Sequence, residues 1–243
     1  MSALPPLWLD AHDLGVRILR NGDDPWLTPG EFGLFQRELA GWLGLDLVDL
    51  GLGPALEMAR QDAGEAPADG GDIEDLLDGR ALQARIVEAV TAVSGALPGR
   101  PVVLRLPGPA ALARAWLGDD ADDDAIDDTA MALAGLARAV FRPGLASIAV
   151  EETDAAGLAA LQPLINLARH YETPLVLILH GADAPADGFA QVYRPQPADG
   201  DGAIVPAAFW QGDGAAPAAG NRFGRVPPDL HPDAVLAGIA RLR

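Results

Sequence analysis

The chain alternates short apolar runs with amphipathic segments, and this alternation constrains its fold more than any other feature of the sequence. The clearest example is residues 100–112, RPVVLRLPGPAAL, where a β-branched run (102–106) precedes a Pro-Gly-Pro turn and an Ala/Leu-rich segment typical of a helix start. The same order of elements recurs at least five times along the chain. Strands that are each followed by a helix indicate a parallel sheet covered by helices.

Five apolar runs are predicted as strands: residues 7–11, 45–50, 102–106, 145–150 and 174–179. Apolar residues at three- and four-residue spacing predict helices over residues 28–43, 73–97, 125–141, 157–171 and 232–242. Beyond residue 179 the sequence predicts only two short strands, 189–193 and 203–209, and no helix between them. Residues 195–202 and 211–222 are predicted as loops. Residues 51–54 are predicted as a plain turn and residues 61–71 as a surface loop.

These elements predict an α/β fold: a single (β/α)8 TIM-type barrel over residues 1–243 with an abbreviated C-terminal half. The alternative is a doubly wound open sheet. Against it, the first strand is not followed by the G-x-G-x-x-G turn of dinucleotide-binding folds.

Charge and composition exclude several classes of function. The formal net charge of −18 opposes binding to nucleic acid or to an anionic membrane. The chain has no lysine, which excludes Schiff-base catalysis and a P-loop lysine, and no cysteine, which excludes disulfides and thiolate metal ligands. No run approaches the roughly 20 apolar residues of a membrane helix, so we expect a cytoplasmic protein.

An acidic run covers residues 119–128, DDADDDAIDD. It lacks the glycine and the terminal glutamate of an EF-hand loop. A solvated loop that leads into a helix N-terminus is the better interpretation, because carboxylates are favoured there.

In a barrel of this type the functional site is built where the strands end. The polar residues at the predicted strand ends are Asp10, His12, Arg105, Glu151, Glu152, His180 and Arg194. Strand alternation sends one of the two adjacent glutamates inward, and Glu152, in step with Val150, is the one we expect. His12, Glu152 and His180 are then the catalytic candidates, either as an acid–base set or as a metal site; the alternative for each histidine is an ordinary hydrogen-bonded residue.

Arg105 stands inside an apolar strand, where a guanidinium needs a partner. Two partners are considered: Glu152 on the adjacent strand, or the carboxylate of a bound ligand. Asp10, Glu151 and Arg194 are predicted to contact the same substrate, and Trp210 to line the pocket. No stoichiometric zinc is expected, since thiolate ligands are absent and the chain has four histidines.

Several stretches resemble one known superfamily. The stretch 102–118, VVLRLPGPAALARAWLG, resembles the strand and turn of the uroporphyrinogen decarboxylase and cobalamin-independent methionine synthase superfamily. Residues 37–51, 145–152 and 174–181, and the tail 226–239 (VPPDLHPDAVLAGI), are similar to other parts of that fold. The resemblance implies a barrel enzyme of methyltransferase or decarboxylase type that acts on a carboxylate-bearing substrate.

The chain also departs from that superfamily. Its methionine-synthase-type members hold zinc with a histidine, cysteines and a glutamate. His180 matches the histidine by position, but the thiolate ligands are absent. Arg17 and Arg20, with Asp10 and Asp13, correspond to the substrate-binding residues of the decarboxylases, without the surrounding motif.

Two functions therefore stay open. One is an enzyme that binds a small molecule in the barrel mouth, and the other is a degenerate barrel that serves as a partner subunit or binding module. The sequence identifies no cofactor. Abbreviated units after the fifth strand should leave apolar sheet surface uncovered, which predicts a homodimer or a hetero-complex.

Overall fold

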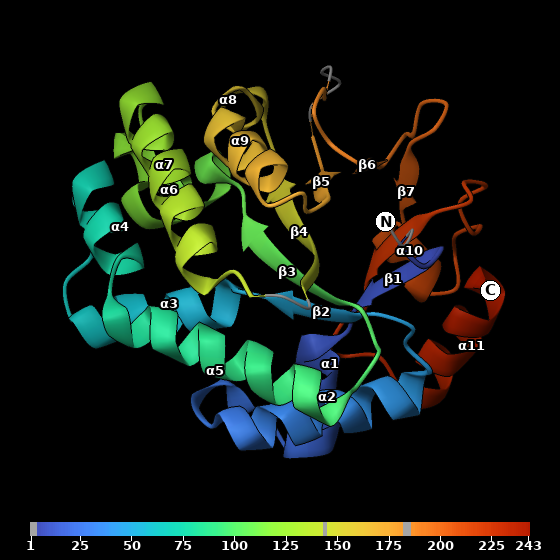
Figure 1. Cartoon of the computed structure of the whole chain (residues 1–243). Helices are drawn as coiled ribbons and strands as arrows, with labels where there is room; N and C mark the ends of the chain where they lie inside the picture. The colour runs from blue at the N-terminus through green and yellow to red at the C-terminus, as the bar shows by residue number, and fades with distance from the viewer. Residues whose placement is uncertain (1–3, 143–144, 182–185) are drawn as a thin grey trace. The chain divides into compact units, whose positions relative to one another are not determined.

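The computed structural model describes residues 4–142, 145–181 and 186–243. Within them, eight strands form one sheet. Their bounds are Leu7–Asp10 (β1), Val48–Gly51 (β2), Val102–Pro107 (β3), Leu145–Glu152 (β4), Leu175–Leu179 (β5), Gln191–Arg194 (β6), Gly202–Ile204 (β7) and Arg222–Arg225 (β8). The strands are labelled in Figure 1.

The order of hydrogen-bonded neighbours is β1-β8-β7-β6-β5-β4-β3-β2, and the recorded pairs are parallel. From β2 to β8, each strand therefore lies beside its neighbour in sequence, and the first strand lies beside the last. This is the strand order of a (β/α)8 barrel, so the predicted fold class is confirmed. A doubly wound sheet would place β1 in the middle of the order, and that alternative is wrong.

Helices follow most of the strands. Their bounds are His12–Arg20 (α1), Pro29–Leu43 (α2), Gly53–Ala63 (α3), Gly70–Leu77 (α4), Arg80–Ala96 (α5), Pro109–Leu117 (α6), Asp123–Val140 (α7), Ala155–Ala159 (α8), Gln162–His170 (α9), Ala207–Trp210 (α10) and Pro232–Leu242 (α11). Between β7 and β8 stands only the four-residue α10, and the described residues between β5 and β7 contain no helix. The abbreviated C-terminal half is confirmed.

The chain divides into two compact units: Met1–Asp49 with Ala89–Val102 and Tyr193–Arg243, and Leu50–Glu88 with Val103–Val192. We call them the terminal unit and the central unit. The single domain over residues 1–243 stays a prediction. Among the described residues, no helix has both the length and the apolar character needed to cross a bilayer.

The central unit contains the layer of helices α4, α6, α7 and α9. The helix α6 lies beside α7, and α4 packs against the other side of α7 (Figure 1). The Asp122 carboxylate caps α7 by accepting from the Ala125 N–H at 2.9 Å, so the acidic run does lead into a helix start as predicted. The buried face of α7 carries Ile126, Leu133 and Leu136 at helical spacing.

In the terminal unit, β1 and β8 pair in parallel, with Trp8 opposite Phe223. The Trp8 ring makes edge-on contacts with Phe223 and with Tyr193 of β6, so these three rings share one face of the sheet. The opposite face carries Gly224, and the Trp210 ring fills the space beside that glycine. Trp210 also contacts Gly238 of α11, so the ring packs under the closing helix.

Several predicted boundaries are wrong for local reasons. The turn predicted at residues 51–54 is the start of α3, which uses Pro54 in its first turn. The long helix 73–97 is two helices, separated at Asp78 and Gly79, and the helix 157–171 is divided at Ala160 and Leu161. The strand β8 was not predicted: it begins at the last residue of the predicted loop 211–222, and its short sequence, RFGR, carries little apolar pattern.

Candidate functional site

Three charged side chains meet at the ends of three neighbouring strands of the central unit. Arg105 comes from β3, Glu151 from β4, and His180 follows β5 directly. The Nη1 of Arg105 donates to Glu151 Oε2, and His180 Nε2 lies 2.7 Å from Glu151 Oε1. Glu151 therefore connects the guanidinium and the imidazole, one with each carboxylate oxygen.

The three side chains differ in their exposure to solvent. Those of Arg105 and Glu151 are 10% and 13% exposed, whereas that of His180 is 35% exposed. Arg105 and Glu151 are thus mostly shielded from solvent, and His180 is the member of the cluster that solvent reaches most. Gly51, at the end of β2, leaves space for the guanidinium, since a Cβ there would lie 2.7 Å from Arg105 Nη2.

This arrangement can orient an imidazole. A carboxylate on one ring nitrogen fixes the orientation of the ring, as in carboxylate–histidine pairs of acid–base catalysts. Within the described residues, the other ring nitrogen of His180 has no recorded hydrogen bond. His180 is the most exposed of the three side chains, so a bound molecule would contact this imidazole first.

Glu152 lies elsewhere, and the prediction that it joins Arg105 and His180 is wrong. Its side chain is fully buried, and its Oε2 accepts from the N–H of Ala110, in the first turn of α6, at 3.1 Å. Its Oε1 accepts from the N–H of Thr153 at 2.6 Å. Burial raises the pKa of Glu152, and the hydrogen bonds from these backbone N–H groups oppose that rise.

Two glycines make room for the Glu152 carboxyl group. A Cβ at Gly108 would lie 2.2 Å from Glu152 Oε2, and one at Gly157 would lie 1.9 Å from the same atom. Glu152 therefore joins the end of β4 to the starts of α6 and α8. Because it follows Glu151 directly in the chain, it also fixes the stretch of backbone that carries Glu151.

The remaining predicted site residues belong to the terminal unit, and the described residues there give each charged one a partner. Asp10 Oδ2 accepts from Arg225 Nε at 3.0 Å, and Arg194 Nε donates to Asp201 Oδ2 at 3.1 Å. His12 Nε2 lies 3.0 Å from Asp24 Oδ2.

Two further sets of predicted residues do not form part of the cluster at Glu151. Trp210 packs under α11, so the prediction that it lines a strand-end pocket finds no support. Arg17 donates to the Leu230 carbonyl and Arg20 to Glu38, so both of these arginines have protein partners.

The described residues contain no group of three histidine or carboxylate side chains arranged to hold a metal ion. The predicted catalytic or metal-binding set was His12, Glu152 and His180. Glu152 does not fit that role, because its carboxylate accepts from the Ala110 N–H at the start of α6. The central carboxylate is Glu151, which the sequence analysis assigned only to substrate contact. The sequence did not point to Gly51, Gly108 and Gly157 as parts of the site. Gly51 and Gly108 lie at or just beyond the ends of β2 and β3, which is a weak signal, whereas Gly157 lies within α8 and carries none.

Comparison with protein-family models and with curated proteins finds no match to this chain. The resemblance of residues 102–118 to the decarboxylase and methionine synthase superfamily therefore stays a hypothesis. The contacts of Glu151 with Arg105 and His180 are the structural feature that bears on function.

Proposed function

We propose that the protein is an enzyme that binds a small carboxylate-bearing molecule at the carboxyl ends of β3, β4 and β5. In this proposal His180 exchanges a proton with the bound molecule. The observation that carries it is the position of Glu151, which contacts the buried Arg105 with one oxygen and the half-exposed His180 with the other.

The charges of the cluster fit such a substrate. Arg105 and Glu151 together are neutral, so protonation of His180 adds one positive charge at the exposed position. A substrate carboxylate would be attracted to that charge. Arg105 holds the Glu151 carboxylate in place by donating to its Oε2. Glu151 in turn orients the imidazole.

Proton exchange at His180 serves both reaction types that the superfamily resemblance implies. In a decarboxylation, the bond to the carboxyl carbon breaks, carbon dioxide leaves, and the electron pair that stays on the substrate takes a proton from the imidazolium. In a methyl transfer, the nucleophile forms a bond to the methyl carbon of a second, methyl-donating substrate, and the donor leaves with the electron pair of the bond that breaks. A neutral imidazole accepts the proton that the nucleophile loses. The residues present do not decide between these reactions, and no cofactor is assigned.

The test is calorimetric titration of the protein with acetate, succinate and benzoate. We expect at least one of them to bind the wild type, and His180→Asn and Glu151→Gln to abolish or strongly weaken that binding. The matched control is His231→Asn, because His231 is an exposed N-cap of α11 and asparagine caps helices equally well. Equal binding by the wild type and by His180→Asn would refute the proposal.

A non-catalytic binding module is the second candidate. The observation that favours it is that the chain between β6 and β8 contains no helix longer than the four-residue α10, so the C-terminal half lacks full strand–helix units of the kind that build a barrel active site. NMR in deuterated water separates the two candidates. It measures whether the carbon-bound hydrogens of a bound carboxylate molecule exchange with the solvent. Binding without His180-dependent exchange would favour the module.

We further propose that the protein acts in the cytoplasm, does not bind nucleic acid, and associates with itself. The net charge of −18 supports the second point, because phosphate groups would be repelled. Self-association is supported by exposed apolar side chains such as Met131.

A further inference from the structure

The backbone at the end of β4 is hydrogen-bonded to the segments that follow both of its neighbouring strands. The Gly108 N–H, just beyond β3, donates to the Glu151 carbonyl at 2.6 Å. On the other side, the His180 N–H, just beyond β5, donates to the Glu152 carbonyl at 3.0 Å. The position of these two residues therefore bears on all three strands that supply the candidate site.

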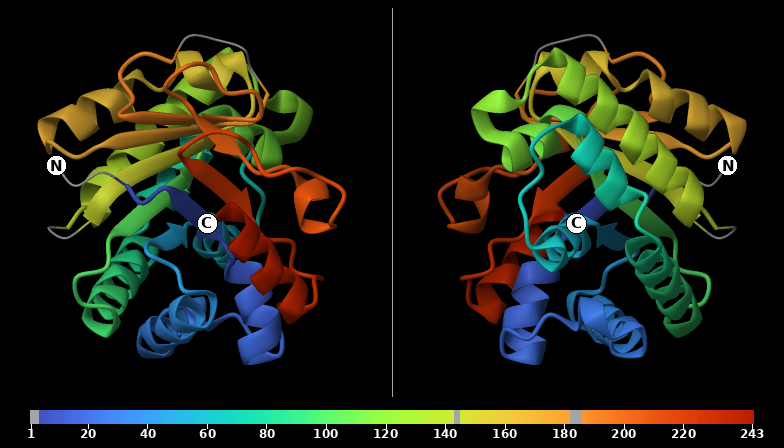
Figure 2. Two further views of the ribbon diagram at one scale, coloured as in Figure 1. Left: turned by 90° about the vertical axis from the view of Figure 1, so that its right-hand side faces the viewer. Right: turned by 90° about the vertical axis from the view of Figure 1, so that its left-hand side faces the viewer.

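The Glu152 side chain holds the same segment from the helix side. Its Oε2 accepts from Ala110 at the start of α6, and its Oε1 accepts from Thr153 and lies 3.4 Å from the Asp154 N–H, just before α8. The helices α6 and α8 contact each other, and both views of Figure 2 show them in the upper part of the picture, α6 in green and α8 in gold. One carboxyl group thus joins β4 to the starts of two helices.

Close approaches on both sides leave this carboxyl group little freedom to move. A Cβ added to Gly157 of α8 would overlap with the Glu152 carboxyl group. A Cβ added to Gly181, the residue after His180, would overlap with the Thr153 carbonyl oxygen. A displacement of Glu152 would therefore move Thr153, and Thr153 lies against the backbone beside His180.

Hydrogen bonds give Glu152 a role that packing alone would not need. By strand alternation, Ile148 and Val150 lie on the same face of β4, and both are buried apolar residues. An apolar side chain could fill the position of Glu152 without the cost of burying a carboxyl group. Directional bonds to particular N–H groups instead fix the segment in one place.

We propose that Glu152 is a positioning residue for the strand-end site, which places Glu151 and the backbone of His180 without touching the bound molecule. Its effect on catalysis rests on the proposed function, whereas its effect on the geometry of the cluster does not. Glu151 contacts Arg105 with one oxygen and His180 with the other, so a shift of the segment changes both contacts. A misplacement of about 1 Å can slow a reaction by about 100-fold.

NMR of protein with 15N-labelled histidine tests the positioning role. The chain has four histidines, and the imidazole signals of His180 are those missing from His180→Asn. Glu152→Ala should shift these signals and leave those of the exposed His170 and His231 unchanged. Glu152→Gln keeps the size of the side chain and one oxygen acceptor, so it should restore the His180 signals in large part. A purely structural role would lower stability without moving the His180 signals of the folded protein.

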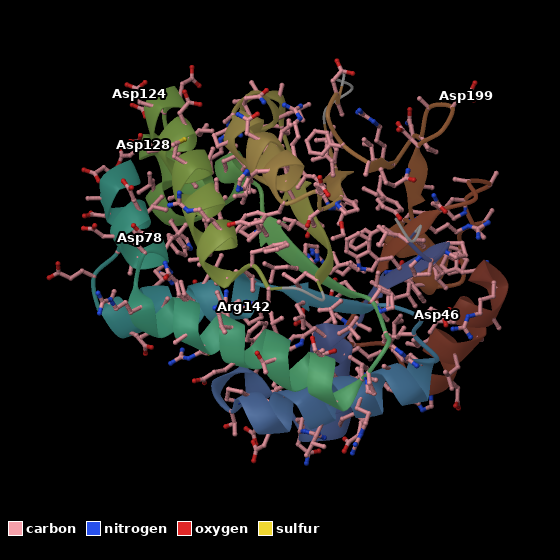
Figure 3. The ribbon with its side chains drawn as sticks, in the orientation of Figure 1. Asp46, Asp78, Asp124, Asp128, Arg142 and Asp199 are labelled. Atoms are coloured by element: carbon pink, nitrogen blue, oxygen red, sulfur yellow. The ribbon has the colours of Figure 1, made fainter. Side chains whose placement is uncertain are left out.

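Gly157→Ala tests the same role from behind the site, and it keeps the proposal falsifiable if Glu152→Ala does not fold. It displaces the Glu152 carboxyl group and leaves every side chain of the cluster in place. We expect the His180 signals to shift and the His180-dependent hydrogen exchange to slow by up to about 100-fold. Two controls should change neither: Gly95→Ala, where the added methyl meets open space, and Asp124→Asn, which removes an exposed carboxylate on α7 (Figure 3).

The positioning role and the proposed function fail separately. Unchanged His180 signals in Gly157→Ala and in folded Glu152→Ala would overturn the positioning role. Equal shifts at His170 and His231 would also overturn it, because they would indicate a general change in structure. Shifted His180 signals in a protein that binds none of the three carboxylates would support the positioning role and refute the proposed function.

Discussion

Replacing Arg105 by methionine should destabilise the protein by removing the cation that compensates Glu151. Methionine keeps the apolar stem of the side chain and loses the guanidinium. Breaking a buried ion pair from one side costs about 3–5 kcal/mol. The His180 imidazole remains 2.7 Å from Glu151 Oε1 and compensates in part. We therefore expect the lower end, about 3 kcal/mol, or a fall of about 6–12 °C in Tm for a chain of this length.

Urea unfolding followed by the fluorescence of the five tryptophans measures this loss. A double-mutant cycle compares the wild type with Arg105→Met, Glu151→Gln and the double variant. Because the double variant leaves no uncompensated charge, it should recover much of the loss, with a coupling energy of about 1.5–3 kcal/mol. Arg37→Met, on the exposed face of α2, is the control and should change stability by less than about 0.5 kcal/mol.

Two results would refute this reasoning. A loss below about 1 kcal/mol in Arg105→Met would mean that the pair does not hold the site together. A variant that keeps its stability but loses carboxylate binding would instead assign Arg105 to the ligand, which is the other role that the sequence leaves open.

Three further predictions concern Glu152, its glycine neighbours and metal content. The pKa of Glu152 is raised in the folded protein. Its contribution to the free energy of unfolding is therefore present below the pKa of the unfolded chain and is lost as the pH rises through the pKa of the folded protein. Glu152→Gln should lessen this fall in stability with rising pH, as measured by urea unfolding, and Glu65→Gln at an exposed position is the control. Gly157→Ala should cost about 1–3 kcal/mol by forcing the Glu152 carboxyl group from its place. Its control, Gly95→Ala, has open space around the added methyl and should be neutral or stabilising. Elemental analysis should find no stoichiometric zinc, and one tightly held zinc per chain would contradict that expectation.

The regular part of the fold follows from local pattern. The run 102–106 and its Pro-Gly-Pro turn predict β3 and α6, and both form where expected, because Pro109 enters the first helical turn and Gly108 precedes it. The strands β4 and β5 are equally clear as apolar runs. The helix α1 and the strand β8 were not predicted, since both are short and charged or glycine-containing. The strand β8 also pairs with β1, which lies far away in the sequence.

The strand–helix alternation, the shortened C-terminal half, and the positions of Arg105, the two glutamates and His180 near strand ends could all be read from the sequence. The glutamate that meets Arg105 could not, because it depends on contacts between distant segments of the chain. The run LASIAV is covered on both faces, so its apolar residues do not alternate with polar ones and do not show which face is which. Contacts with distant residues determine which way each glutamate points. The N–H groups and glycines at the start of α6 and at α8 accommodate the Glu152 carboxyl group. Glu151 therefore lies on the side of Arg105 and His180.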